Sequence, residues 1–190
     1  MTPSAHQAIA ETRAWVERAV IGLNLCPFAK AVHGKNQVRY VVSQADTPEA
    51  LLAELGDEMN RLAATDPLLI DTTLLIHPQV LNDFLDFNDF LGAADGLLEQ
   101  LGHEGVLQVA SFHPRFQFAG TDADDVTNAT NQSPYPTLHL LREASIDRAV
   151  AAFPEAEAIF EANMQTLEKL GADGWAALQA WWQADASKPV

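Results

Sequence analysis

The chain is poor in cysteine and in long apolar runs, and each shortage excludes a class of protein. Cys26 is the single cysteine among 190 residues, so no disulfide can form within the chain. No apolar run approaches the roughly 20 residues needed to cross a bilayer. The first residues also lack the basic and then apolar segments of a secretory signal. We therefore expect a cytoplasmic protein with no membrane partner.

Basic residues are scarce as well, with 11 Lys and Arg against 26 Asp and Glu and a net charge of −15. The charge is uneven: residues 1–40 hold five cations and two carboxylates, or +3, which leaves −18 for the rest. A surface this acidic repels phosphate backbones, so we expect no nucleic-acid partner.

Several familiar signatures are missing from the sequence. It contains no Walker A sequence, no G-x-G-x-x-G, no G-x-S-x-G and no H-E-x-x-H. The sequence therefore carries none of the common motifs that would identify a nucleotide-binding protein, a hydrolase or a zinc protease. What is present is a hydrophobic content of 48%, enough for one domain over residues 1–190 with a substantial core.

Strand and helix patterns alternate along the first two thirds of the chain. We expect strands at 38–43, 72–76 and 106–112, with helices at 5–22, 47–64 and 81–101. This order predicts an α/β fold in which three parallel strands are joined by crossover helices. Residues 137–141 are expected to add a fourth, edge strand to a mixed sheet flanked by helices. Further helices are expected from Ser145, at 155–170 and at 173–184.

Two of the predicted strands end in the same dipeptide, His77-Pro78 and His113-Pro114. Proline favours an extended backbone at the residue before it, so each histidine is held at the carboxyl end of its strand. Ligands of open parallel sheets bind at that edge. Imidazole suits metal ligation or proton transfer, but each ring could instead bond a nearby carbonyl and simply end its strand.

A long polar loop, 113–136, follows the second of these histidines, and loops of this length are usually functional or disordered. Arg115 and Arg142 could clamp an anionic substrate through forked hydrogen bonds. Carboxylates and imidazoles of the region suit a divalent transition metal, with His77, His113, Asp122 and His139 as the candidate ligands. Further candidate contacts to a small-molecule ligand are Asp124, Asn128, Asn131 and Tyr135. The alternative is a solvated, turn-forming loop.

Cys26 precedes Pro27 in an apolar segment and is a third candidate. Its thiolate could act as a nucleophile, a metal ligand or a haem ligand, above all if it meets His113 in space. The alternative is a buried and unreactive thiol, because Leu23, Leu25 and Phe28 surround it in the sequence.

Two segments carry a resemblance to a known family. They are Gly22-Leu23-Asn24-Leu25-Cys26-Pro27-Phe28-Ala29 and Ser111-Phe112-His113-Pro114-Arg115-Phe116, the latter with its loop through Ser133-Pro134-Tyr135-Pro136 and Leu140-Leu141-Arg142-Glu143. Over about residues 10–150 the chain resembles an uncharacterised bacterial family catalogued as a domain of unknown function. The resemblance implies a small stand-alone bacterial protein and supplies no catalytic residue or cofactor.

These observations favour an enzyme that acts on a small anionic molecule at the carboxyl edge of the sheet, with or without a metal. His113, Arg115, Asp124 and Cys26 would be its catalytic residues. The alternatives are a non-catalytic protein that binds a metal, haem or metabolite, and a subunit that binds another protein. A homodimer through the Phe- and Leu-rich side of the helix near 82–90 is also compatible with the sequence.

Overall fold

The computed structural model describes residues 3–152 and 158–186, in which four strands and their helices follow one another along the chain. The elements in order are α1 (Ala5–Trp15), the π-helix η1 (Val16–Ile21), α2 (Ala29–Gly34), β1 (Val38–Val42), α3 (Pro48–Ala64), β2 (Thr72–Ile76), α4 (Phe84–Gln100), β3 (Leu107–Phe112), the 3-10 helix η2 (Val126–Asn131), β4 (Thr137–Arg142), α5 (Glu143–Ala152) and α6 (Ile159–Ala186).

The strands form one mixed sheet in the order β1-β2-β4-β3. β1 pairs with β2 in parallel, and β4 runs antiparallel to both of its neighbours. The α/β class, the mixed sheet and the flanking and C-terminal helices are confirmed. The expected edge position of β4 is wrong, because the long loop after β3 returns the chain into the gap between β2 and β3. Leu138 and Leu140 are fully buried there, as befits a central strand.

This topology brings the two histidine-bearing strand ends to one edge of the sheet. β2 and β3 are both antiparallel to β4, so they point in the same direction and both end beside its first residues. Ile76 and Phe112 face the same β4 residue, Thr137, from opposite sides. The sequence argument that His77 and His113 share an edge therefore holds although their strands are not neighbours.

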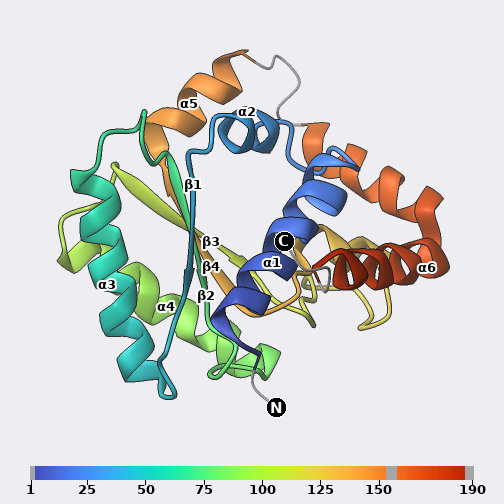
Figure 1. Cartoon of the computed structure of the whole chain (residues 1–190), viewed down its shortest axis with the longest axis horizontal. Coiled ribbons are helices and arrows are strands. Elements are labelled where there is room, and N and C mark those ends of the chain that lie inside the picture. The colour runs from blue at the N-terminus through green and yellow to red at the C-terminus, as the bar shows by residue number, and fades with distance from the viewer. Residues whose placement is uncertain (1–2, 153–157, 187–190) are drawn as a thin grey trace.

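Two layers of helices cover the two faces of the sheet (Figure 1). On one face α3 and α4 bury an aliphatic core that includes Leu75, Leu138 and Leu140. On the other face α1, η1, η2 and α6 bury a core that includes Trp15, Leu74 and Phe112. Successive side chains of a strand point to opposite faces, which explains why adjacent residues such as Leu74 and Leu75 belong to different cores.

The ends of several helices differ from the expected ones. Thr47 caps α3 through its hydroxyl as expected, with Pro48 at the first helical position. The helix expected over 5–22 instead changes from α to π geometry at Val16. Ser145 does not cap a helix, because α5 already begins at Glu143 and the hydroxyl of Ser145 donates to Asp71.

The two expected C-terminal helices are confirmed within α6, which consists of two helices that meet at Gly171, where φ is 70° and the backbone is not helical. That left-handed backbone is easy for glycine and costly for other residues. The start of the first expected helix, at 155–157, lies outside the described residues. Over residues 3–152 and 158–186 no helix is both long and apolar enough to span a bilayer.

Candidate functional site

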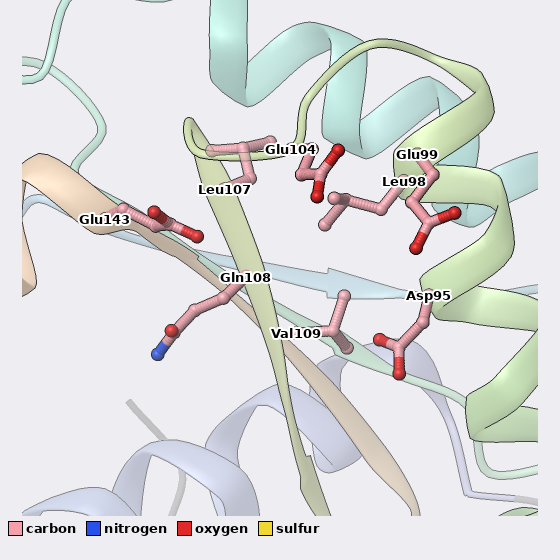
Figure 2. A pocket seen from close by; sticks show the side chains of 8 residues that line it. All are labelled: Asp95, Leu98, Glu99, Glu104, Leu107, Gln108, Val109 and Glu143. Atoms are coloured by element: carbon pink, nitrogen blue, oxygen red, sulfur yellow. The ribbon is translucent and has the colours of Figure 1, made fainter.

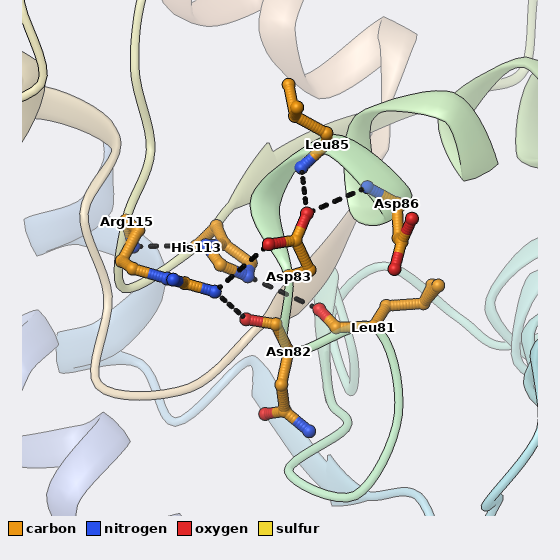
Figure 3. Close-up of polar contacts among 7 residues, drawn as sticks. All are labelled: Leu81, Asn82, Asp83, Leu85, Asp86, His113 and Arg115. Atoms are coloured by element: carbon orange, nitrogen blue, oxygen red, sulfur yellow. Dashed lines mark hydrogen bonds and ion pairs between the residues drawn. The ribbon is translucent and has the colours of Figure 1, made fainter.

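The side chains of His77, His113 and Arg115 all bind one turn at the carboxyl edge of the sheet. His77 Nδ1 bonds the carbonyl of Val80 at 3.0 Å, and His113 Nε2 bonds the carbonyl of Leu81 at 3.3 Å. The Arg115 guanidinium donates to the next carbonyl, that of Asn82, at 2.7 Å. Three successive carbonyls are thus held by three side chains, an arrangement that we call the carbonyl clamp. Figure 3 shows the His113 and Arg115 part of it.

The clamp fixes the protonation of His113. A carbonyl oxygen cannot donate, so Nε2 must carry the proton that it gives to Leu81. Nδ1 is then the acceptor of the Arg115 backbone N–H at 3.0 Å. Burial lowers the pKa of His113, and the ring is neutral and bonded at both nitrogens. In this state His113 has no free lone pair with which to act as a general base.

His77 lies deeper in the same arrangement. Its ring is fully buried and stacks on Phe87, whose other neighbour is the His113 ring at 5.2 Å between centroids. Burial lowers the pKa of His77 to about 4. Its Nε2 has no hydrogen-bond partner among the described residues. The two imidazoles do meet at one edge, as predicted, but with their protons directed at backbone carbonyls.

The clamped turn is strained and leads directly into α4. Leu81 has φ 57°, a left-handed conformation that is unusual for a branched side chain. Asp83 caps α4 by accepting from the N–H groups of Leu85 and Asp86, and its other oxygen lies 3.4 Å from the Arg115 guanidinium. The clamp therefore holds Leu81 in place and orients the start of α4.

The polar residues of the loop 113–136 also form hydrogen bonds mainly with other groups of the protein. The buried Asn128 accepts from the Phe118 N–H and the Thr121 hydroxyl, and donates to the Asp122 carbonyl. Asn131 donates to the Ser111 carbonyl at 3.1 Å. These bonds hold the loop against the end of β3.

Tyr135 connects the loop to the helical layer, because its hydroxyl donates to the Glu11 carboxylate of α1 at 2.7 Å. Burial and this carboxylate raise the pKa of the Tyr135 phenol, so it stays protonated. Asp122 and Asp124 are exposed on the same loop. Their predicted roles, Asp122 as a metal ligand and Asp124 as a catalytic residue, stay predictions.

The predicted metal ligands do not gather into one centre. His139 lies on the opposite face of the sheet from His77 and His113, where its Nε2 is 2.6 Å from the Thr72 hydroxyl and burial lowers its pKa to about 4. Successive residues of a strand alternate in direction, which fixes this separation. In the described part of the chain no three His, Cys, Asp or Glu side chains are placed to share a metal ion.

Arg142 is a buried structural cation in this arrangement. Its guanidinium donates to the carbonyls of Leu62, Thr65 and Ile70 at 2.6–3.0 Å, where α3 ends and the chain turns toward β2. Leu62 lies in the last turn of α3, Thr65 is its C-cap and Ile70 lies just before β2, so Arg142 ties the end of the helix to the turn that follows it. It lies at the opposite end of the sheet from Arg115, so the two arginines do not form the predicted pair of clamps.

The Gly22–Ala29 motif forms a tight exit from η1. A Cβ on Gly22 would lie 2.2 Å from the Arg18 carbonyl oxygen, so glycine is required there. Asn24 has φ 54°, and the Asn163 amide donates to the Leu25 carbonyl at 2.8 Å. Burial raises the pKa of the Cys26 thiol, which opposes a thiolate nucleophile at neutral pH.

One group of polar atoms was missed by the sequence argument. Between the sheet and the helices α1, η2 and α6, six buried polar atoms have no hydrogen-bond partner within the described residues. We call this group the donor layer; it consists of the indole N–H groups of Trp15, Trp175 and Trp182 and the hydroxyls of Thr12, Tyr40 and Thr130. The sequence offered one signal for it, since three of the four tryptophans occur within residues 175–182.

Four of the six members of the donor layer share one apolar core. Trp15, Trp175 and Trp182 belong to the same buried cluster, and Tyr40 packs against it. The Trp175 and Trp182 rings are 5.3 Å apart, and burial raises the pKa of the Tyr40 phenol to about 12. An indole N–H can only donate a hydrogen bond, so this core contains donors in excess of acceptors.

Comparisons with known proteins agree with the resemblance seen in the sequence. Neither the curated proteins nor the solved structures include a significant match to this chain. A family model described as protein of unknown function, DUF1415, matches residues 7–177, which extends beyond the expected 10–150 and takes in most of α6. The chain therefore belongs to the DUF1415 family.

Proposed function

We propose that the chain binds a small anion with several hydrogen-bond acceptors inside the donor layer, between α1, η2, α6 and the sheet. The observation that carries the proposal is the set of three indole N–H groups left without an acceptor in one core. Carboxylate, phosphate or carbonyl oxygens are the groups that such donors bind.

The energetic argument is that buried donors without acceptors are costly. Each buried polar group without a partner costs about 1–3 kcal/mol. Six such groups cost on the order of 6–18 kcal/mol, comparable with the whole stability of a typical domain. A bound molecule that accepts hydrogen bonds removes much of this cost. Buried water is the competing occupant, and the experiment below distinguishes the two.

Charge supports an anionic ligand. The first 40 residues carry +3 in a chain of −15, and α1 belongs to this basic segment. The Arg13 guanidinium lies 5.0 Å from the centre of the Tyr40 ring, and that of Arg18 lies 4.3 Å from the centre of the Trp181 ring. Arg13 is thus the cation that lies beside the donor layer, at Tyr40, on which Glu17 also acts, whereas Arg18 lies over Trp181 outside the layer.

The test is native mass spectrometry of untagged protein, followed by identification of any small molecule released on denaturation. We expect a bound anion of defined mass, and we expect Trp175→Phe and Trp182→Phe to reduce its occupancy severalfold, because phenylalanine keeps the bulk and removes the donor. Trp181→Phe is the matched control, since Trp181 is 51% exposed. Occupancy that is equal in all three variants would refute the proposal.

An enzyme acting at the carboxyl edge of the sheet is the second candidate, and the position of Arg115 favours it. The Arg115 side chain is 64% exposed beside His113, so one face of the guanidinium is available to an anionic substrate. Catalysis by His113 would require it to release Leu81 first. Elemental analysis beside the His113→Ala variant tests the metal-dependent form: stoichiometric metal lost in a folded variant would support it, and metal-free parent protein would exclude it.

A further inference from the structure

The outer side of β3 is an unpaired sheet edge. Glu143 N–H donates to the Val106 carbonyl, which sets the alternation of the antiparallel ladder between β3 and β4. Gln108, Ala110 and Phe112 therefore bond to β4, whereas the backbone groups of the intervening residues point away from it. Those outward residues are Leu107, Val109 and Ser111.

Part of this edge is already covered by the protein itself. The Leu107 N–H donates to the His103 carbonyl, and the Ser111 carbonyl accepts from the Asn131 amide. No partner within residues 3–152 and 158–186 takes the Leu107 carbonyl, either backbone group of Val109 or the Ser111 N–H. Two carbonyls and two N–H groups thus alternate along a free edge, as a β-ladder requires.

An acidic hollow adjoins the free edge (Figure 2). It has a volume of about 280 Å³, and Leu98, Leu107 and Val109 form its apolar wall. Four carboxylates line it, one from the first residue of α5, one from the turn before β3 and two from α4: Glu143, Glu104, Asp95 and Glu99. Among the residues that the structure describes, no cationic side chain lines the hollow.

We propose that this edge binds an extended basic peptide, which adds to β3 as a fifth strand. The free backbone groups of Leu107, Val109 and Ser111 supply the ladder, and the hollow receives the lysine or arginine side chains that alternate along one face of the peptide. Charge selects this occupant over a second copy of the chain. Two copies paired edge to edge would place eight carboxylates against one another, and like charges oppose such an interface.

The experiment is a titration of the full chain with an acetylated and amidated hexapeptide of alternating lysine and valine, with amide exchange followed by NMR. In the free protein we expect the Val109 and Ser111 amides to exchange much faster than the Ala110 amide, which is bonded to β4. On saturation with the peptide, both should become protected by at least tenfold. The same peptide with glutamate in place of lysine should not bind.

A matched pair of double variants tests the role of the hollow. Glu99→Gln with Glu104→Gln removes two charges at the site and should weaken peptide binding roughly tenfold at low salt. Asp57→Asn with Glu168→Gln removes two charges from exposed positions elsewhere and should leave the affinity within twofold. Amides of Val109 and Ser111 that stay unprotected, or an equal loss of affinity in both double variants, would overturn the proposal.

Discussion

The carboxyl edge of the sheet and the donor layer differ in how their polar groups are used. At the edge, the residues that look catalytic in the sequence bind the protein's own backbone, as His77, His113 and Arg115 do in the carbonyl clamp. In the donor layer, residues that look like ordinary core leave their N–H and O–H groups without partners. Polar residue type alone thus points to the first region, and unmet hydrogen bonding points to the second.

The comparison teaches that a reactive side chain can bind a ligand only when its donors and acceptors are not already bonded within the protein. Asn128 has three such bonds and Arg142 has three carbonyl partners. Buried groups of this kind are costly to leave unpaired, so they are retained for stability without any ligand. The predictions below distinguish polar groups that stabilise the fold from polar groups that bind a ligand.

The largest effect is expected at Arg142. Arg142→Ala removes the guanidinium from the carbonyls of Leu62, Thr65 and Ile70, of which Leu62 keeps the Thr65 N–H as a donor. The variant should lower the free energy of unfolding by about 3–5 kcal/mol in chemical denaturation. Arg115→Ala is the matched control, because that side chain is largely exposed and the loss of its bond to the Asn82 carbonyl and of its ion pair with Asp83 should together cost only about 1–2 kcal/mol. Equal losses in the two variants would show that the buried and exposed arginines do not differ in role.

The next effect is a dependence of stability on pH through His77. Its pKa is about 4 in the folded protein and about 6.5 when unfolded, so below pH 6.5 the unfolded chain binds a proton that the folded chain does not. Stability should be full above pH 6.5, fall as pH decreases and level off near pH 4, with a loss of about 3 kcal/mol from this residue.

The variant His77→Asn isolates that contribution, because asparagine can donate to the Val80 carbonyl and does not titrate. The difference in free energy of unfolding between parent and variant should narrow by about 3 kcal/mol between pH 6.5 and 4. Parallel curves over this range would mean that His77 is not buried in its neutral form.

A smaller effect is expected in the loop after β3. Asn128→Ala removes three hydrogen bonds from a buried amide and should cost about 2–3 kcal/mol, with faster amide exchange at Phe118. Asp124→Ala, on the exposed side of the same loop, should stay within about 0.5 kcal/mol. A larger loss at Asp124 than at Asn128 would reverse the assignment of the two residues.

Local patterns in the sequence were sufficient for the four strands and the longer helices, but not for α2, η2 or the arrangement of the strands. The Thr47-Pro48 cap and the continuous apolar run at 72–76 identify a helix start and a buried strand from neighbouring residues alone. The insertion of β4 between β2 and β3 depends on a pairing across more than 60 residues, and no local pattern reports it. The π-helix of η1 likewise depends on packing against α6 and on the exit at Gly22.

The same local reasoning predicted only part of the candidate site. Proline after His77 and His113 correctly indicated that both rings lie at one edge of the sheet. The atoms that the two rings bond are determined by the turn at Leu81. The φ of 57° at this residue is not predicted by any pattern in the sequence. The donor layer needs three-dimensional knowledge of a different kind, because a tryptophan in a core is ordinary until its N–H is found without an acceptor.

The central claim is tested most directly by NMR of the four indole N–H groups in ¹⁵N-labelled protein, assigned with single Trp→Phe variants and titrated with phosphate, succinate and citrate. We predict that at least one anion shifts the Trp15, Trp175 and Trp182 signals downfield together, in a saturable manner, while exposed Trp181 stays unchanged. Shifts confined to the Trp181 signal would contradict the account. So would contacts between the three buried indole N–H groups and long-lived water, with signals that do not shift on addition of any of the anions.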